Sequence, residues 1–406
     1  MTPFIKYLRI KNFKSITDLE IRDIPAFAVF AGPNGAGKSN FFEALKFVSD
    51  FVRFGIRAAL KMHDGYENIH SVKLKGKNAR TFEFEIILEQ SLAWNIKGQE
   101  HTFSTFRYTL CINALDSEPI INESTWYDEK QHSKRYRSAE KDSFLGIADV
   151  EEQFPPFGED SFSHLRIPTD PSILRYDFSA RALSGIRKLH IDPIGAKNAN
   201  SLQYDNSELE EKAHNLVSVM TRLEKNDTIR ETIMDMMSLF APAFEQASTQ
   251  QERLRAAHIL TIKERGVKKE FPAHLISDGT IYALALLVAV LDRHKDDAWT
   301  LIEEPERGLH PKAIAEMINF MRSRVFATEI VTPRNTKDTL QTQMRRPIWL
   351  TTHSATVVRH CKAGELWFVE KENGGTVIRR AEVHPESRME LDEAWLSNAL
   401  DGGLPW

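Results

Sequence analysis

The chain has 406 residues, 42% of them hydrophobic, which is enough for one large core and for two or three average domains. Lys and Arg number 53 against 57 Asp and Glu, so the net charge of −4 excludes a global field that would draw the chain onto nucleic acid. Only two cysteines are present, which excludes a disulfide scaffold or a zinc knuckle. The longest apolar run, 281–291, is too short to cross a bilayer, so we expect a cytoplasmic protein without membrane contact.

The N-terminal region reads as strands followed by a helix. Residues 4–10 and the following DLEI segment predict two short strands, and 26–31 is an apolar strand that runs directly into GPNGAGKSN. A helix is expected from about Lys38 to residue 60, because its apolar residues recur at spacings of three and four.

The middle of the chain loses this alternation of strand and helix. Segments 81–88, 105–115 and 121–129 alternate in hydrophobicity and predict an antiparallel lobe. Residues 130–172 are polar and contain Pro155 and Pro156, which favours a loop or a mobile insertion.

Helical patterns return in the second half. Residues 208–226 and 228–244 predict two helices with a short connection and no sustained heptads. A strand pair is expected over about 255–275, then a buried helix over 277–291 and two buried strands that end at TLIEEPERGLHP and PIWLTTHS. The segment 328–346 is interpreted as a surface loop.

The C-terminal segment carries the apolar residues Trp395, Leu396 and Trp406. These side chains are expected to dock either on the core or on a partner.

The glycine-rich stretch matches the Walker A pattern, with an apolar strand before it and a helix after it. Its backbone amides would cradle phosphate, the Lys38 ammonium would reach the β and γ phosphates of ATP, and the Ser39 hydroxyl would take a Mg²⁺ position. The residues of the expected phosphate cradle are Gly32, Pro33, Asn34, Gly35, Ala36, Gly37, Lys38, Ser39 and Asn40.

Two adjacent carboxylates follow the apolar strand at 299–302, as in a Walker B motif. Neighbouring residues of a strand point to opposite sides, so the two acids take different roles. We assign Glu303 to Mg²⁺ and Glu304 to general-base catalysis; a solvated acidic turn is the alternative. His353, at the end of the strand in PIWLTTHS, is the only ionisable group there and would contact the γ-phosphate or the attacking water.

Five segments in this order, LRIKNFKSITDLEI, GPNGAGKSN, LISDGTIYALALL, TLIEEPERGLHP and LTTHS, resemble the ABC-type ATPases of the RecF, SMC and OLD group. The resemblance implies an α/β fold: an ABC-type P-loop NTPase head with a central parallel sheet, an antiparallel β lobe and a helical insertion. It implies one composite ATPase over 1–406. The expected parts are a nucleotide-binding core at 1–60 and 270–370, the β lobe at 80–130, an insertion at 130–260 and a C-terminal extension at 371–406.

The same resemblance implies that a signature loop of a second subunit completes the nucleotide site. Ser277, Asp278 and Gly279 match that loop, although Asp278 stands where Gly is common and Glu303 where Asp is usual. Lys14 matches a basic position that contacts nucleotide in some relatives; an exposed strand-end lysine is the alternative. The Q-loop glutamine would be expected within 66–78, but that segment contains no glutamine. His310 is expected near the dimer seam.

The expected activity is ATP hydrolysis with ATP and Mg²⁺ as ligands, by a homodimer or higher homo-oligomer that closes around ATP. The absence of long heptads and the resemblance to ATPase subunits of anti-phage defence systems favour a sensor for a separate nuclease or toxin effector. The alternative is a RecF-like ATPase of DNA repair, for which the basic segments 253–269 and 73–80 are candidate DNA contacts. A third class, a scaffold that binds ATP without turnover, is disfavoured by Glu304 and His353.

Overall fold

The structure is a computed structural model, and it describes residues 4–96, 99–127, 130–138, 141–145, 183–205, 207–252, 256–292, 299–331, 340–362, 364–381 and 391–397. The chain divides into two compact units. The lobe unit comprises residues 1–25, 43–185 and 371–378, and the core unit comprises 26–42, 186–370 and 379–406. None of the described helices is long and apolar enough to span a membrane.

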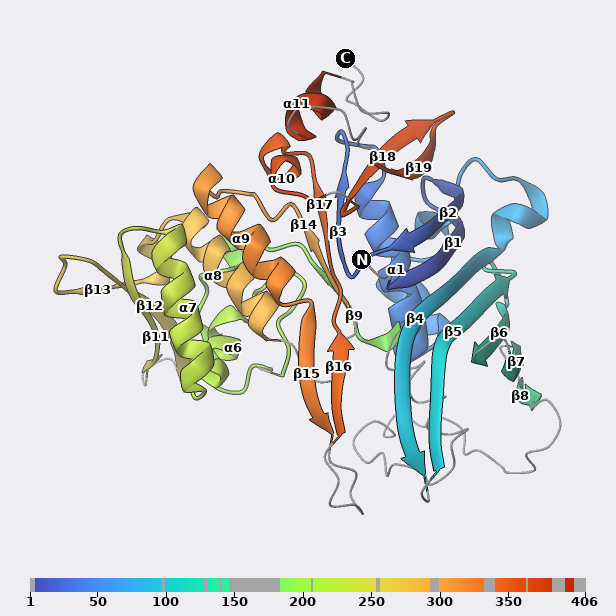
Figure 1. Ribbon diagram of the computed structural model, residues 1–406, viewed down its shortest axis with the longest axis horizontal. Coiled ribbons are helices and arrows are strands. Elements are labelled where there is room, and N and C mark those ends of the chain that lie inside the picture. The colour runs from blue at the N-terminus through green and yellow to red at the C-terminus, as the bar shows by residue number, and fades with distance from the viewer. Residues whose placement is uncertain are drawn as a thin grey trace. The chain divides into compact units, whose positions relative to one another are not determined.

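A six-stranded sheet is the centre of the core unit, in the order β19-β18-β3-β17-β14-β9 (Figure 1). Its inner strands pair in parallel, and β3, β14 and β17 are buried along their whole length, which explains their continuous apolar sequences. The strands are β3 (Phe27–Ala31), β9 (Ile186–Leu189), β14 (Trp299–Glu303), β17 (Ile348–Thr352), β18 (Leu366–Glu372) and β19 (Gly375–Arg380).

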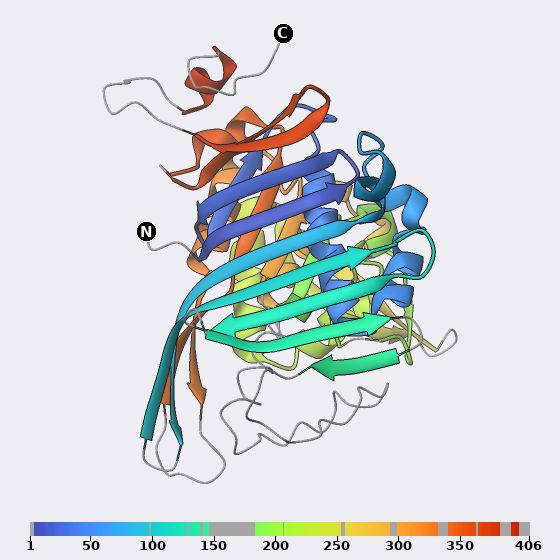
Figure 2. The ribbon, with the colours of Figure 1, turned by 90° about the vertical axis from the view of Figure 1, so that its right-hand side faces the viewer.

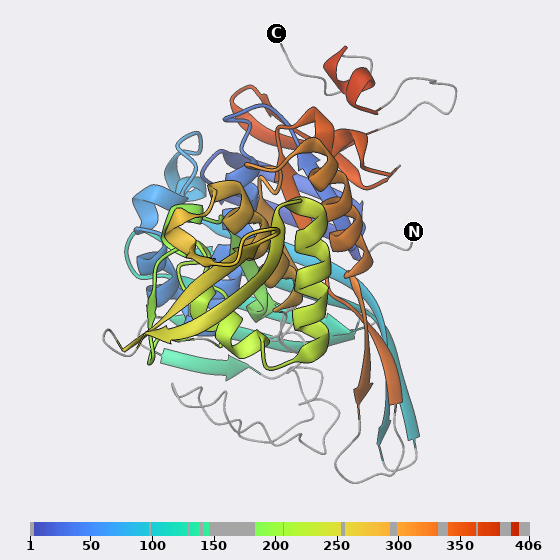
Figure 3. The same ribbon diagram turned by 90° about the vertical axis from the view of Figure 1, so that its left-hand side faces the viewer.

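Helices and a second sheet complete the core unit. Helix α8 (Asp278–Leu291) is apolar and buried on every side from Ile281 to Val290, and α7 lies beside both α8 and α9 (Figure 1). A small antiparallel sheet, in the order β10-β12-β11 with β13 on β12, packs near α6 and α7 (Figure 3). The remaining elements are α5 (Pro193–Ala196), β10 (Asn200–Ser201), α6 (Leu216–Leu223), α7 (Asp227–Phe240), β11 (Phe244–Glu252), β12 (Ala257–Glu264), β13 (Glu270–Pro272), η3 (Ala273–Leu275), α9 (Pro311–Ser323) and α10 (Ala355–Arg359).

The lobe unit is built on a seven-stranded antiparallel sheet in the order β2-β1-β4-β5-β6-β7-β8 (Figure 2). Along β4, Phe82, Phe84, Ile86 and Leu88 alternate with partly exposed residues, so one face of the sheet is apolar. The elements are β1 (Ile5–Phe13), β2 (Ile16–Ile24), α1 (Lys38–Phe54), which begins in the core unit, α2 (Ile56–Met62), α3 (Tyr66–Ile69), η1 (Gly76–Arg80), β4 (Phe82–Ile96), β5 (Gln99–Asn113), β6 (Ile120–Tyr127), β7 (Lys130–Ser138) and β8 (Lys141–Leu145).

Three predicted segments differ from the structure. The helix expected to run to residue 60 is interrupted at Gly55, whose φ of 79° lies outside the helical region. The first helix of the pair begins at Leu216 rather than 208, because turns occupy the preceding residues. The segment 328–346, interpreted as a loop, contributes to the antiparallel pair β15 (Phe326–Val331) and β16 (Leu340–Arg345), whose sequences suit strands.

Two further differences concern residues 130–260. Strands β7 and β8 extend the lobe sheet into the segment expected to be a loop, and residues 146–172 lie outside the described residues. Strand β9 belongs to the central sheet although its residues lie in the predicted insertion. Four residues give too short a pattern to identify a buried strand.

The described C-terminal helix docks on the core unit. Trp395, in α11 (Leu391–Leu396), is fully buried and stacks on Phe368 with ring centroids 6.4 Å apart. Arg359 of α10 forms an ion pair with Asp392 at 2.7 Å. Trp406 lies outside the described residues. For Trp395, the structure therefore decides between the two alternatives in favour of the core.

We expect Trp395→Ala to lower the free energy of unfolding by about 3–5 kcal/mol, because it removes a large buried side chain. Leu396→Ala is the matched control, since Leu396 is 41% exposed and its truncation should change stability by less than about 0.5 kcal/mol. Urea unfolding followed by tryptophan fluorescence and circular dichroism measures both. Equal stability of the two variants would contradict the docking.

Candidate functional site

In the glycine loop between β3 and α1, backbone conformation at one position and close packing at another favour glycine. Gly37 has a φ of 107°, in the left-handed region where a side chain is strained. A Cβ added to Gly32 would lie 2.1 Å from the carbonyl oxygen of Val369, so this position excludes any larger residue. Helix α1 starts at Lys38, directly after the loop, and its first amides therefore point towards the loop.

The Lys38 side chain is buried at the centre of the loop. Its Nζ donates to the carbonyl oxygens of Gly32, at 2.7 Å, and Pro33, at 2.9 Å. Burial lowers the pKa of Lys38, and the nearby carboxylates of Glu304, Glu306 and Glu303 oppose that shift. The ammonium is thus held where a phosphate on the loop would meet it.

A cavity of about 190 Å³ adjoins the loop. It is lined by Asn34, Gly35, Gly37, Lys38, Ser39, Asn40, His190, Glu303, Glu304 and Thr351. All these residues belong to the core unit. The structure therefore brings the predicted Walker A and Walker B residues to one cavity.

Glu303 is almost fully buried at the tip of β14. His190 Nδ1 lies 2.9 Å from Glu303 Oε2, and Lys188 Nζ lies 3.8 Å from Glu303 Oε1. Lys188 belongs to β9, and His190 directly follows it. Both lie close to Glu303 because Leu189 of β9 pairs in register with Ile302, the residue before Glu303. Two potential donors therefore face the carboxylate that the sequence assigns to Mg²⁺.

His190 was not identified from the sequence, in which the only further polar residue sought was a Q-loop glutamine within 66–78, where none stands. The described lining of the cavity includes no residue of that segment. The sequence pattern that could have identified His190 is the short strand IRKL, which His190 directly follows. This is the pattern that had identified Glu303 and His353, but four residues are too few for it to stand out.

Glu304 faces a different side from Glu303. Its Oε1 lies 3.1 Å from His353 Nδ1, so the second carboxylate and the histidine after β17 form a pair. The backbone of Glu304 has a φ of 50°. Two hydrogen bonds hold it: the Glu304 N–H donates to the Thr351 carbonyl at 2.9 Å, and the Glu304 carbonyl accepts from the Tyr282 hydroxyl at 2.6 Å. Strained residues of this kind persist where the surrounding structure fixes them.

The signature segment lies at the start of α8. Ser277 caps the helix by accepting from the Thr280 N–H at 3.2 Å, and Asp278 forms an ion pair with Lys197 at 2.5 Å. Gly279 packs so closely on Gly308 that an added Cβ would lie 2.4 Å from the Gly308 carbonyl oxygen. None of Ser277, Asp278 and Gly279 lines the cavity of its own chain. His310 caps α9 by accepting from the Lys312 N–H at 3.3 Å.

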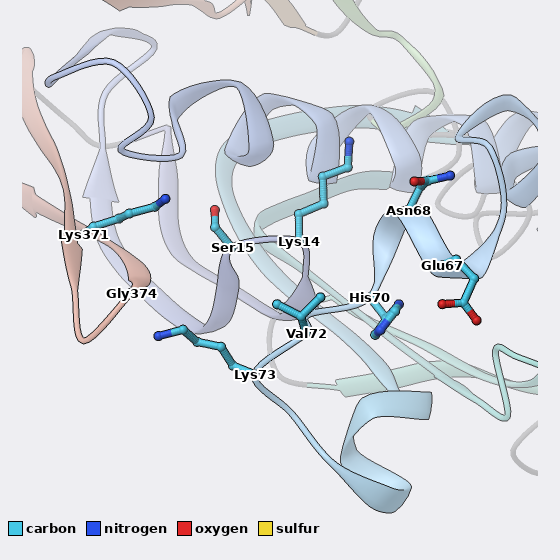
Figure 4. A pocket seen from close by; sticks show the side chains of 9 residues that line it. All are labelled: Lys14, Ser15, Glu67, Asn68, His70, Val72, Lys73, Lys371 and Gly374. Carbon is cyan, nitrogen blue, oxygen red and sulfur yellow. The ribbon is translucent and has the colours of Figure 1, made fainter.

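Lys14 lies in the lobe unit, at the turn between β1 and β2. It forms an ion pair with Glu43 and lines another hollow, of about 320 Å³, together with Ser15, Lys73 and Lys371 (Figure 4). It is not among the residues that line the cavity at the glycine loop.

Known proteins share parts of this sequence. Residues 27–359 match the model of the AAA_21 family, described as "AAA domain, putative AbiEii toxin, Type IV TA system". The chain is 35% identical over 91 residues to structural maintenance of chromosomes protein 3 of Dictyostelium discoideum, covering 22% of this chain and 6% of that protein. It is 37% identical over 46 residues to the DNA replication and repair protein RecF of Corynebacterium jeikeium, 11% of each.

Two solved structures share the fold. The Smc head bound to the C-winged helix domain of ScpA superimposes with a TM-score of 0.51 at 14% identity, covering 93% of this chain and 98% of that one. The Smc head with an extended coiled coil, bound to the C-terminal domain of ScpA from Pyrococcus furiosus, gives 0.50 at 13% identity, with 93% and 96% coverage. The chain therefore belongs to the AAA_21 family and is an ABC-type ATPase of the RecF and SMC group.

Proposed function

We propose that this chain hydrolyses ATP with Mg²⁺, and that two copies close around the nucleotide. The pairing of Glu304 with His353 beside the glycine-loop cavity carries this proposal, because a phosphate-binding loop alone needs no base. Glu304 accepts the proton of the attacking water, and His353 orients the Glu304 carboxylate. Lys38 binds the β and γ phosphates.

The residues fit a divalent cation. Oε1 of Glu303 is buried and accepts no hydrogen bond from any described residue, as expected of an oxygen that faces a cation. The described chain offers no cluster of three or more His, Cys, Asp or Glu side chains that would hold a metal alone. Ser39 and Glu303 would therefore hold Mg²⁺ together with the phosphates, and the cation would neutralise charge on the γ-phosphate.

The position of the signature segment supports the proposed dimer. Ser277, Asp278 and Gly279 lie at a helix N-terminus, where anions bind, yet they do not line the cavity of their own chain. A second copy gives them a γ-phosphate to contact. Closure with ATP and opening after hydrolysis then make the nucleotide a switch between two assemblies.

We further propose that this switch controls a separate effector, a nuclease or toxin, in anti-phage defence. Two observations support a partner protein. The family description includes a toxin and a toxin–antitoxin system, and the two Smc heads of this fold are bound to ScpA domains. The effector of this chain would be recognised by co-purification with the product of a neighbouring gene.

A RecF-like role on DNA is the second candidate, favoured by the hollow in the lobe unit (Figure 4). Three turns meet there: the Lys14 N–H donates to the Ile69 carbonyl at 2.7 Å, and Ser15 Oγ lies 2.6 Å from Thr376 Oγ1. The turns bring exposed Lys73 and Lys371 to one surface, where phosphates would bind.

We expect Lys38→Ala to lose ATP binding, since the ammonium is the only buried cation that the loop holds among its described residues.

Glu304→Gln should retain ATP binding, lower kcat by at least about 100-fold and accumulate a closed dimer with ATP. Nucleotide binding, phosphate release and light scattering measure these effects. Unchanged turnover and size for Glu304→Gln would show that Glu304 is not the base.

Tyr282→Phe removes the hydroxyl that holds the Glu304 carbonyl and keeps the packing of the ring. We expect kcat to fall about tenfold while the affinity for ATP stays the same, because one hydrogen bond positions the base. Tyr204→Phe is the control, since its hydroxyl makes only a 3.5 Å contact with Glu210 on the surface. Equal kcat values for both variants would show that the bond has no role in turnover.

The DNA role is tested by duplex binding over a range of salt concentrations. If the hollow binds the DNA backbone, the affinity of the double variant Lys73→Ala, Lys371→Ala should depend less steeply on salt. The slope of log affinity against log salt should become less negative by about 2. The double variant Lys6→Ala, Lys61→Ala, of exposed lysines in the same unit, serves as the control. A wild-type chain without salt-dependent duplex binding would leave the effector role as the remaining proposal.

A further inference from the structure

A third carboxylate, Glu306, lies buried beside the proposed base and its histidine. Glu306 Oε1 accepts a hydrogen bond from the Thr352 hydroxyl at 2.6 Å. It lies 4.0 Å from His353 Nδ1, too far for a hydrogen bond, whereas Glu304 lies at 3.1 Å from the same nitrogen. Any effect of Glu306 on the histidine is therefore indirect.

Thr352 links Glu306 to the turn that carries His353. Its hydroxyl oxygen accepts from the Ser354 N–H at 2.9 Å, so its single hydrogen is left for Glu306. The carbonyl of Thr352 accepts from the Gly32 N–H at 3.2 Å. The residues on both sides of His353 are thus tied to one buried hydroxyl, and that hydroxyl is oriented by Glu306.

The environment of Glu306 favours an uncharged acceptor. Oε2 is buried and has no hydrogen-bond partner among the described residues, and an ionised carboxylate in that position would be costly. Burial accordingly raises the pKa of Glu306. A neutral carboxylic acid can still accept the Thr352 hydrogen bond through Oε1, so the bond does not require the charge.

We propose that Glu306 is a positioning residue for His353: by accepting the Thr352 hydroxyl it fixes the 352–354 turn and so sets the imidazole against Glu304. The inference rests on the proposed ATP hydrolysis by Glu304 and His353. It adds to that proposal a residue that does not line the glycine-loop cavity. A hydrogen bond, and not a charge, carries the effect.

The test compares variants that break this bond with variants that keep it. Glu306→Ala and Thr352→Val should each lower kcat about tenfold with the KM for ATP unchanged within about twofold, because placement of the histidine affects turnover and not binding. Glu306→Gln and Thr352→Ser keep an acceptor and a donor and should retain kcat within about threefold. The double variant Glu306→Ala, Thr352→Val should lose no more than either single variant, since both remove the same bond.

Controls separate this inference from the proposed function. Glu316→Ala, an exposed carboxylate of α9, should match the wild type, and ATP binding with thermal unfolding checks that each variant is folded. If the wild type does not hydrolyse ATP, the proposed function is wrong. If Glu304→Gln and His353→Ala hydrolyse ATP normally, the roles of Glu304 and His353 in the reaction are wrong. If those two are inactive while Glu306→Ala and Thr352→Val match the wild type, only the positioning role is overturned. Equal losses in Glu306→Gln and Glu306→Ala would also overturn it.

Discussion

Parallel pairing of β3, β17, β14 and β9 brings the carboxyl ends of four strands to one edge of a buried sheet. Every strand ends in groups of the candidate site: the glycine loop, His353, the two glutamates and His190. Residues far apart in sequence therefore lie close together because of strand pairing, and not because of contacts between their own side chains. The apolar interior of the sheet supplies the free energy that fixes their positions.

Charge at this edge is arranged by burial and pairing. Lys38 lies near three carboxylates, and each carboxylate has a different environment. Glu303 faces His190 and Lys188, Glu304 faces His353, and Glu306 is bonded to a hydroxyl. Like charges so close together would repel each other if all were ionised and unpaired. The different partners allow adjacent acids to serve different purposes.

The two compact units place polar groups differently. The core unit gathers its site groups at strand ends around a cavity with a buried lysine. The lobe unit presents Lys73 and Lys371 on exposed turns around an open hollow. A buried site suits chemistry on one nucleotide, whereas exposed surface charges suit a long anionic surface.

The sequence by itself determined the strands and helices that have strong periodicity or glycine punctuation: β3, the glycine loop, α8, β14, β17 and the lobe strands β1, β2, β4, β5 and β6. It also identified Glu303, Glu304 and His353 as groups at strand ends, because an apolar run that stops at a polar residue is a local pattern. Tertiary structure alone showed that Glu304 pairs with His353 and that Trp395 is buried in the core unit.

The short range of sequence patterns also explains why β9, His190 and Glu306 could not be identified from the sequence. Strand β9 has four residues, and its place in the sheet depends on parallel pairing with β14, more than a hundred positions away. The roles of His190 and Glu306 depend on which side chains lie opposite them across strands and turns. Local sequence fixes backbone preference and apolar pattern, but long-range pairing decides which polar groups meet, since that follows from the packing of the whole sheet.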